Sequence, residues 1–269
     1  MEQPVVYTEE YVGKLPVKEC NDPLVNLLDY CPDIILELDK DNTVDGIPKG
    51  VCYVRREVAI RLARAQGDLS KYGYSLVIDG GYRSEKLQKA IWDKYYNLLH
   101  EKHPEWSDEK LLEEINKFVS PVGPGYIGSH CTGGAVDISL RKNGEKASLG
   151  GAPEDEEEIT ERASLKYENL SLEEKENREI LTRTMRRHGF NPYPLEIWHW
   201  SYGDPYWSAY TGNVTKYGSI KSIEDARERG LLKEKMSFAD FLSYSLNELI
   251  YKSLGQRMFY KLHDSLFGP

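Results

Sequence analysis

Two short stretches carry the side chains best suited to bind a metal ion. The first reads SHCTGGAVD and contains His130 and Asp137, seven positions apart. The second reads EIWH and contains Glu196 and His199. Catalytic zinc sites use three protein ligands, keep a position open for water, and hold a base nearby. Two histidines, one aspartate and a further glutamate therefore predict a catalytic zinc site.

The chain around Asp137 has the alternation of a β-strand. Residues 135–140 place valine, isoleucine and leucine on one face, which leaves Asp137 on the opposite face, above the sheet. Gly133 and Gly134 allow a close backbone approach, so His130 can turn back over Asp137 and share a metal. An ordinary hydrogen-bonded histidine–aspartate pair is the alternative.

Glu196 and His199 pose a geometrical problem. Three positions apart, they would lie on opposite faces of a regular strand. A helix would bring them together, but Pro192, Pro194 and two nearby tryptophans favour a strand. We therefore expect Glu196 in a bend that precedes a strand containing His199. The alternative for Glu196 is a surface carboxylate.

The elements that position these residues follow from periodicity and caps. Helices are expected at about 55–72, 84–101, 107–120 and 171–189, and strands at 34–38, 75–79 and 135–140, with a hairpin turn at Asn143-Gly144 and an otherwise irregular segment 1–50. Arg83 comes just after the strand 75–79, where a rigid scaffold can present it to a pocket. Its alternative is a surface arginine paired with Asp79 or Glu85.

Composition bounds the class of protein. The chain has 269 residues, 40% hydrophobic and 29% charged, which suits one large globular domain or a domain with an appendage. Its net charge of −9 argues against nucleic acid or an anionic membrane as the main partner. The four cysteines form no C-x-x-C pair, so we expect free thiols.

The two ends of the chain differ in character. The first residues lack a basic start followed by an apolar run, which predicts a cytoplasmic protein, or a periplasmic or secreted one if a leader was removed. No stretch is apolar enough for a membrane span. Near the other end, Ser222 and Ser237 are candidate N-caps of two helices. The second is too apolar for free exposure, so we expect it to cover the catalytic domain or a second subunit.

These motifs resemble those of the zinc D-alanyl-D-alanine dipeptidases of the vancomycin-resistance type, within a wider set of peptidoglycan peptidases. Besides SHCTGGAVD and EIWH, the segment 81–83 matches their G-Y-R, and residues 177–190 resemble the helix that leads to the second ligand. The resemblance covers about residues 45–210. Two departures are Ile197, where the family commonly has tryptophan, and the loop 149–155, which matches loosely.

The resemblance implies a role for each site residue. His130, Asp137 and His199 become the ligands of one zinc ion per chain. Glu196 becomes the general base, and Arg83 stabilises the transition state.

The resemblance also suggests residues that would bind the substrate. A dipeptidase must bind a free ammonium, for which Asp155 in the acidic run 154–158 is the candidate, and Ser129 could make a polar contact with substrate. A solvated loop is the alternative for that run.

The sequence thus predicts an α+β fold in which a mostly antiparallel sheet carries one zinc site, with helices packed against it. We expect a catalytic domain over 1–215 and a helical extension over 216–269, through which a homo-oligomer could form. The expected activity is zinc-dependent hydrolysis of D-Ala-D-Ala. The alternatives are a DD-carboxypeptidase or LD-endopeptidase of peptidoglycan, and a zinc-binding module without catalysis.

Overall fold

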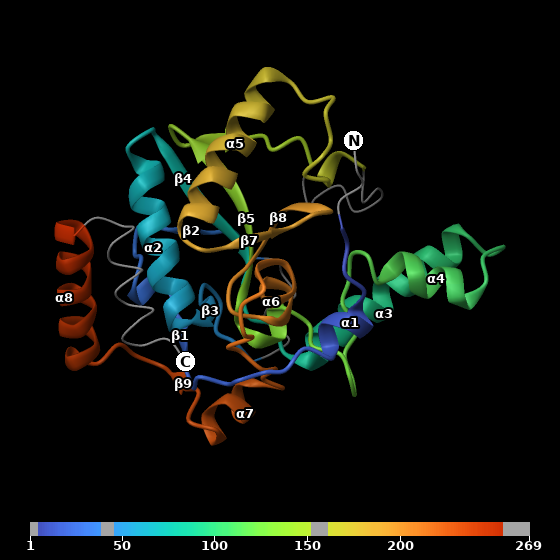
Figure 1. Cartoon of the computed structure of the whole chain (residues 1–269), viewed down its shortest axis with the longest axis horizontal. Helices are drawn as coiled ribbons and strands as arrows, with labels where there is room; N and C mark the ends of the chain where they lie inside the picture. The colour runs from blue at the N-terminus through green and yellow to red at the C-terminus, as the bar shows by residue number, and fades with distance from the viewer. Residues whose placement is uncertain (1–4, 39–45, 152–160, 255–269) are drawn as a thin grey trace.

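The fold is taken from a computed structural model of the chain, which describes residues 5–38, 46–151 and 161–254. Figure 1 shows a sheet near the centre, helices packed around it, a single helix at the left extreme and a pair of helices at the right. The acidic run with Asp155 lies outside the described residues. The fold is α+β, as the sequence predicted.

A six-stranded sheet forms the centre of the molecule. Its order is β2-β4-β5-β8-β7, and β6 pairs with β5 beyond this path. The strands are β2 (Ile35–Leu36), β4 (Tyr74–Gly80), β5 (Ala135–Lys142), β6 (Glu145–Ala147), β7 (Asn191–Tyr193) and β8 (Glu196–Ser201). Only the pairing of β2 with β4 is parallel, so the prediction of a mostly antiparallel sheet is confirmed.

One face of this sheet is covered by two helices, α2 (Arg56–Ser70) and α5 (Leu172–Arg187), which lie side by side in Figure 1. The apolar positions that alternate along β5, such as Ile138, pack there in the main core with Leu62 and Leu181. A strand with one face against helices must direct its other residues the opposite way. Asp137 is therefore turned away from the core.

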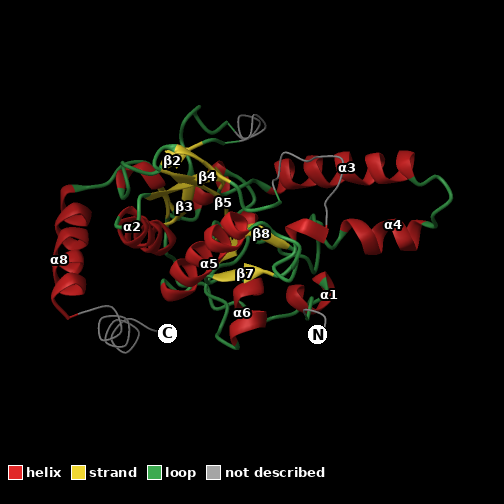
Figure 2. Ribbon diagram, turned by 90° about the horizontal axis from the view of Figure 1, so that it is seen from above, coloured by secondary structure: helices red, strands yellow, loops and turns green. Residues whose placement is uncertain are grey.

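The predicted helix starts and turns are confirmed where caps define them. Ser171 and Glu174 form a capping box at the start of α5. Asn143 and Gly144 adopt positive φ values of 53° and 89° in the turn between β5 and β6. The helices α3 (Glu85–Lys102) and α4 (Asp108–Ile115) form a hairpin that projects from the body in Figure 2.

The expectation of an irregular segment 1–50 is wrong in part. It contains a short helix, α1 (Glu9–Gly13), and a strand, β1 (Leu24–Asn26), besides β2. The strand β1 lies between β3 (Tyr53–Arg55) and β9 (Leu232–Lys233) in a second, three-stranded sheet. A strand of three residues has too little periodicity to be recognised, and partners distant in sequence stabilise it.

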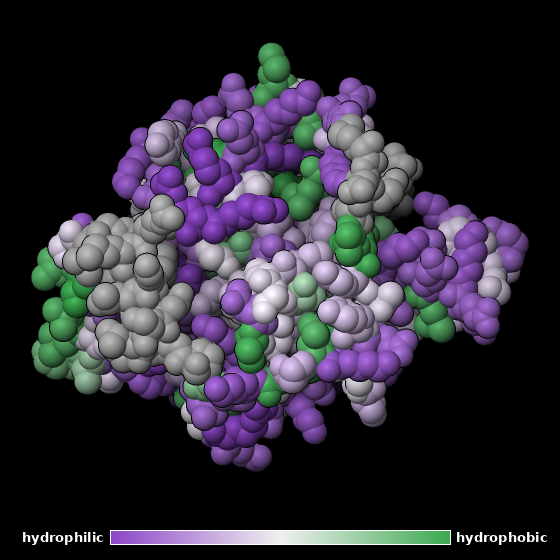
Figure 3. All heavy atoms as spheres, viewed as in Figure 1, coloured by the Kyte–Doolittle hydropathy of each residue, from purple (hydrophilic) through white to green (hydrophobic). Residues whose placement is uncertain are grey.

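The C-terminal helix α8 (Phe238–Leu254) packs beside α2, and shorter helices α6 (Pro205–Thr211) and α7 (Ile223–Glu228) precede it. Glu248 pairs with Arg64 of α2 at 2.7 Å, and the Tyr244 hydroxyl donates to the carbonyl of Tyr30 at 3.3 Å. Its outer face is the green patch at the left of Figure 3, where Phe238 is 75% exposed. This helix thus covers part of α2, and the homo-oligomer and the 215/216 boundary stay predictions.

Two compositional expectations can be compared with the fold. All four cysteines are free thiols, as predicted. Among the described helices, none is both long and apolar enough to cross a membrane.

Candidate metal centre

The two motifs meet at the centre of the sheet. Antiparallel pairing of β5 with β8 places Asp137 directly opposite His199. His130 begins a short 3-10 turn, η3 (His130–Thr132), which Gly133 ends in the left-handed region at φ 72°. All three side chains are buried, with exposures of 5% for His130, 7% for Asp137 and 8% for His199. The backbone turns back at Gly133, as predicted, and this turn brings His130 next to Asp137.

The three side chains converge on one point. His130 Nε2 lies 3.2 Å from Asp137 Oδ2, and His199 Nδ1 lies 3.2 Å from Asp137 Oδ1. The two imidazole nitrogens are themselves 3.2 Å apart. One ligand atom from each residue falls within 4.8 Å of the other two, a spacing at which all three can reach a common ion.

A hydrogen bond at the outer nitrogen of each imidazole determines which nitrogen faces the cluster. His130 Nδ1 lies 2.8 Å from the carbonyl oxygen of Gly81 and must donate to it, so Nε2 presents its lone pair. His199 Nε2 lies 3.2 Å from the hydroxyl of Ser129, which leaves Nδ1 for the cluster. Metal-bound histidines are oriented in this manner, by a second hydrogen bond that sets the tautomer.

Asp137 supplies the second test of fit. Its Oδ1 atom is buried and accepts no hydrogen bond within the described part of the chain, although His199 Nδ1 faces it at 3.2 Å. A buried carboxylate oxygen without a donor is costly unless a cation meets it. Nitrogen and oxygen donors in this number suit zinc. His130, Asp137 and His199 therefore fit a zinc ion.

Two of the three side chains have the charge that a metal ligand needs. Burial raises the pKa of the Asp137 carboxyl, but the charges of His130 and Arg83 outweigh burial and hold that pKa well below its usual range. Burial, assisted by the Arg83 charge, lowers the pKa of His130 to about 4, so this imidazole is neutral at pH 7. Asp137 is thus anionic and His130 neutral at pH 7, the charge states in which each could bind a metal ion.

The placement of Glu196 corrects one expectation. Glu196 is the first residue of β8 itself and does not lie in a bend before it. Pro192 of β7 pairs with Trp200, whereas the next residue, Tyr193, pairs with Glu196, so β8 carries extra residues in between. Such a bulge breaks the alternation of faces. Glu196 and His199 therefore both reach the site, although they are three positions apart.

Glu196 sits beside the cluster without joining it. Its Oε2 lies 3.9 Å from His199 Nδ1, and the residue is 9% exposed. Burial raises the pKa of Glu196 to about 8, although the charge of His199 opposes the effect. Burial therefore makes the Glu196 carboxylate a stronger base than an exposed glutamate.

Arg83 reaches the cluster from the end of β4. Its Nη2 atom lies 2.5 Å from Asp137 Oδ2. The register of β4 against β5 shifts between Ile78 and Gly80, and Gly80 then pairs with Asp137. A Cβ atom on Gly80 would fall 2.9 Å from both Arg83 Nη2 and Asp137 Oδ2. The sequence placed Arg83 correctly at a strand end, but this need for glycine was not foreseen.

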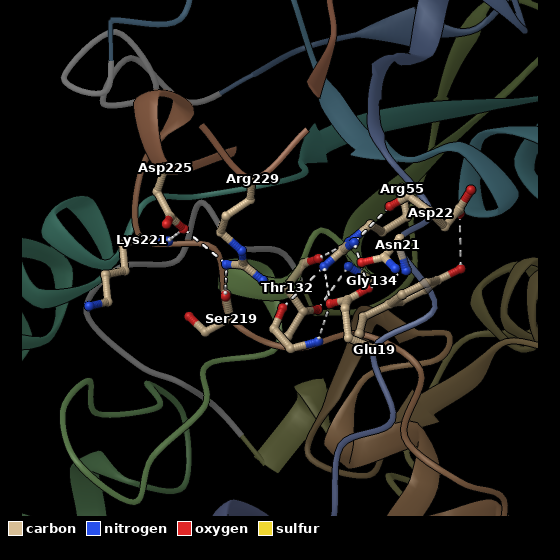
Figure 4. Close-up of polar contacts among 12 residues, drawn as sticks. Glu19, Asn21, Asp22, Arg55, Thr132, Gly134, Ser219, Lys221, Asp225 and Arg229 are labelled. Carbon is tan, nitrogen blue, oxygen red and sulfur yellow. Dashed lines mark hydrogen bonds and ion pairs between the residues drawn. The ribbon is translucent and has the colours of Figure 1, made fainter. Parts of the chain in front are cut away.

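A buried arginine behind the His130 turn escaped the sequence analysis. Arg55 is 0% exposed, and its Nε donates to the carbonyl of Thr132 at 2.6 Å. Its backbone N–H donates to the Gly133 carbonyl at 2.9 Å, and its guanidinium forms two bonds of 3.1 Å with Glu19 (Figure 4). No local motif marks Arg55, because its acceptors lie far away in sequence. It fastens the turn that carries His130.

Two other predicted residues have different outcomes. Ser129 is buried at 5% exposure with its hydroxyl on His199, and its contact with substrate stays a prediction. Asp155 lies outside the described residues.

Comparisons with known proteins place the chain among the metallopeptidases. The chain belongs to the D-ala-D-ala dipeptidase family of peptidases, whose pattern matches residues 39–219. It is 27% identical to a D-alanyl-D-alanine dipeptidase of Enterococcus faecalis over 173 residues, which are 62% of this chain and 82% of the relative. A D-alanyl-D-alanine dipeptidase of Enterococcus faecium is 26% identical over 173 residues, which again are 62% of this chain and 82% of the relative.

Among solved structures, the chain is similar to the LdcB LD-carboxypeptidase, with 22% sequence identity and a TM-score of 0.41. The match covers 82% of each chain. The expectations of family and enzyme class are confirmed.

Proposed function

We propose that the protein hydrolyses the dipeptide D-Ala-D-Ala, with zinc held by His130, Asp137 and His199. The observation that carries the proposal is the buried Glu196 carboxylate, placed beside a His–Asp–His cluster but outside it. A metal-binding module without catalysis needs the three ligands alone. A second carboxylate, separate from the three candidate ligands and with a raised pKa, supports a hydrolase.

Each residue has a distinct task in this reaction. A zinc ion bound there would act as a Lewis acid and lower the pKa of a coordinated water from 15.7 to about 7. Glu196 accepts the proton that the attacking water loses as its oxygen bonds to the peptide carbon. Glu196 then gives this proton to the nitrogen of the breaking C–N bond, so two molecules of D-alanine leave.

We assign to Arg83 the stabilisation of the negative charge that develops on the substrate oxygen in the transition state. Its guanidinium already faces the cluster through Asp137. A donor aimed at the developing oxyanion contributes about 3 kcal/mol in comparable sites. Because the oxyanion exists only in the transition state, Arg83→Ala should lower kcat more than it raises KM.

The proposal is tested by comparing three substrates with the zinc-loaded protein: D-Ala-D-Ala, its N-acetyl derivative and a pentapeptide stem. Liberated D-alanine is measured. A dipeptidase should prefer the free dipeptide, since acylation removes the ammonium charge. Equal or higher kcat/KM for the acylated or longer substrates would instead favour a carboxypeptidase.

Glu196→Gln is the control for chemistry. It should retain zinc and lose roughly 10²–10⁴-fold in kcat, the range of general acid/base contributions. Unchanged turnover in this variant would remove Glu196 from the mechanism.

A further inference from the structure

Helix α8 lies beyond the part of the chain that the family pattern matches, which ends at residue 219, and it stands at one edge of the molecule in Figures 1 and 2. The Tyr244 hydroxyl donates to the carbonyl of Tyr30 at 3.3 Å. Arg64 of α2 pairs with Glu248 at 2.7 Å and lies 4.3 Å from the centroid of the Tyr251 ring. Tyr244, Glu248 and Tyr251 are four and three positions apart, so they share one face of α8. This face holds the helix to the body, and the opposite face is turned outward.

The outward face carries small and apolar side chains in a heptad pattern. Leu242, Leu246 and Leu249 are 51%, 59% and 65% exposed. Ala239 and Ser253, which are also exposed, extend the same alternation of steps of three and four. We call these five residues the outer stripe. A repeat of this kind aligns its members along one side of a helix, the arrangement by which two helices pack against each other.

The outer stripe is large for a surface that only meets water. A helix that is apolar on opposite faces is normally buried. Phe238 beside the stripe is 75% exposed, and with the three leucines it exposes roughly 400–500 Å², since one phenylalanine side chain buries about 150–250 Å². Two such faces together would bury about 800–1,000 Å², which is the lower limit of a specific protein interface.

Charge narrows the class of partner. The outer stripe contains no charged residue, and Lys252 is the only cation in the sequence of α8. A helix that lies on a membrane carries many lysines and arginines on its polar face. The net charge of −9 also opposes binding to an anionic surface. An uncharged stripe that meets an identical stripe brings no like charges into contact.

We propose that the outer stripe pairs with the outer stripe of a second copy of this chain, so that the protein forms a two-fold dimer through α8. In such a dimer the same surface meets itself and must be self-complementary. Ala239 and Ser253 are small, which leaves space at both ends of the stripe for the larger Phe238 of the second copy. Asp137 is turned away from the sheet face that α2 covers, so pairing beside α2 leaves the metal centre open.

The test is the mass of the full, zinc-loaded chain by sedimentation velocity, from about 1 µM to about 1 mM protein. The mass should rise to twice that of one chain. Leu246→Glu should raise the dimer Kd at least about 100-fold, because each dimer would lose two buried leucines and gain two buried charges. Leu172→Glu is the matched control, since Leu172 is 82% exposed on α5, and it should dimerise like wild type. Zinc content and circular dichroism establish that both variants are folded.

The outcomes do not depend on which substrate the protein hydrolyses. Dimers of wild type and Leu172→Glu, with a monomeric Leu246→Glu, would support the proposal. A wild type that stays monomeric up to about 1 mM would overturn it, and co-sedimentation of that monomer with anionic phospholipid vesicles would identify a membrane as the occupant instead. A dimer that Leu246→Glu leaves intact would place the interface elsewhere and equally overturn the proposal.

Discussion

Arg55 offers the sharpest test of how the fold holds the metal centre. Replacement by methionine keeps most of the apolar stem but removes every guanidinium donor. The carbonyls of Thr132 and Asp22, bonded at 2.6 and 2.7 Å, would lose those bonds, and Glu19 would lose its ion pair. Breaking a buried ion pair costs roughly 3–5 kcal/mol. Because the Glu19 side chain is 22% exposed, we expect the lower end, about 3 kcal/mol of unfolding free energy.

The same change should weaken the metal site. The turn held by Arg55 carries His130, and loss of an outer partner of a ligand typically costs about 10–100-fold in metal affinity. Denaturant unfolding of the zinc-free protein measures the first effect, and competition with a zinc chelator measures the second. Arg55→Lys should have a stability and a zinc affinity between those of Arg55→Met and wild type, since one ammonium group cannot replace the several donors of the planar guanidinium.

The neighbouring arginine supplies the matched control. Arg56 is 40% exposed and pairs with Asp22 at 3.2 Å. Because Asp22 keeps the backbone N–H of Glu57 and the Tyr217 hydroxyl as donors, Arg56→Gln should cost less unfolding free energy than Arg55→Met and leave zinc affinity unchanged. If Arg55→Met lowered the free energy of unfolding by less than about 1 kcal/mol and bound zinc normally, the turn that carries His130 would not depend on this arginine.

Three further predictions follow from buried groups at the site. A Cβ on Gly80 would lie 2.9 Å from Arg83 and Asp137, so Gly80→Ala should cut kcat/KM about 100-fold, with unchanged circular dichroism. Burial raises the pKa of Glu9 from 4.5 to about 7, so its ionisation opposes folding by about 3 kcal/mol above pH 7 and not at all below pH 4.5. Denaturant unfolding should accordingly show Glu9→Gln gaining stability over wild type from pH 5 to pH 8; a constant difference would contradict this. Elemental analysis should find His199→Ala without zinc, and unchanged zinc would refute its role as a ligand.

Local sequence determined much of the metal cluster. The period of two along β5 put Asp137 on the face opposite Ile138, and this holds in any strand with one buried face. Gly133 marked the turn that returns His130, because a left-handed residue without a Cβ can reverse the chain tightly. Residue type and spacing therefore predicted the candidate ligands.

Tertiary structure decided what surrounds them. Glu196 joins the site because β8 bulges against β7, and a bulge depends on the pairing of two strands. Glu9 is buried because Tyr206, 197 positions away, donates to it, and Arg55 is fixed by Thr132, 77 positions away. Periodicity within a short window cannot report such contacts. The sequence determined which groups could bind a metal, and long-range packing determined which other charged side chains are buried in the fold that holds them.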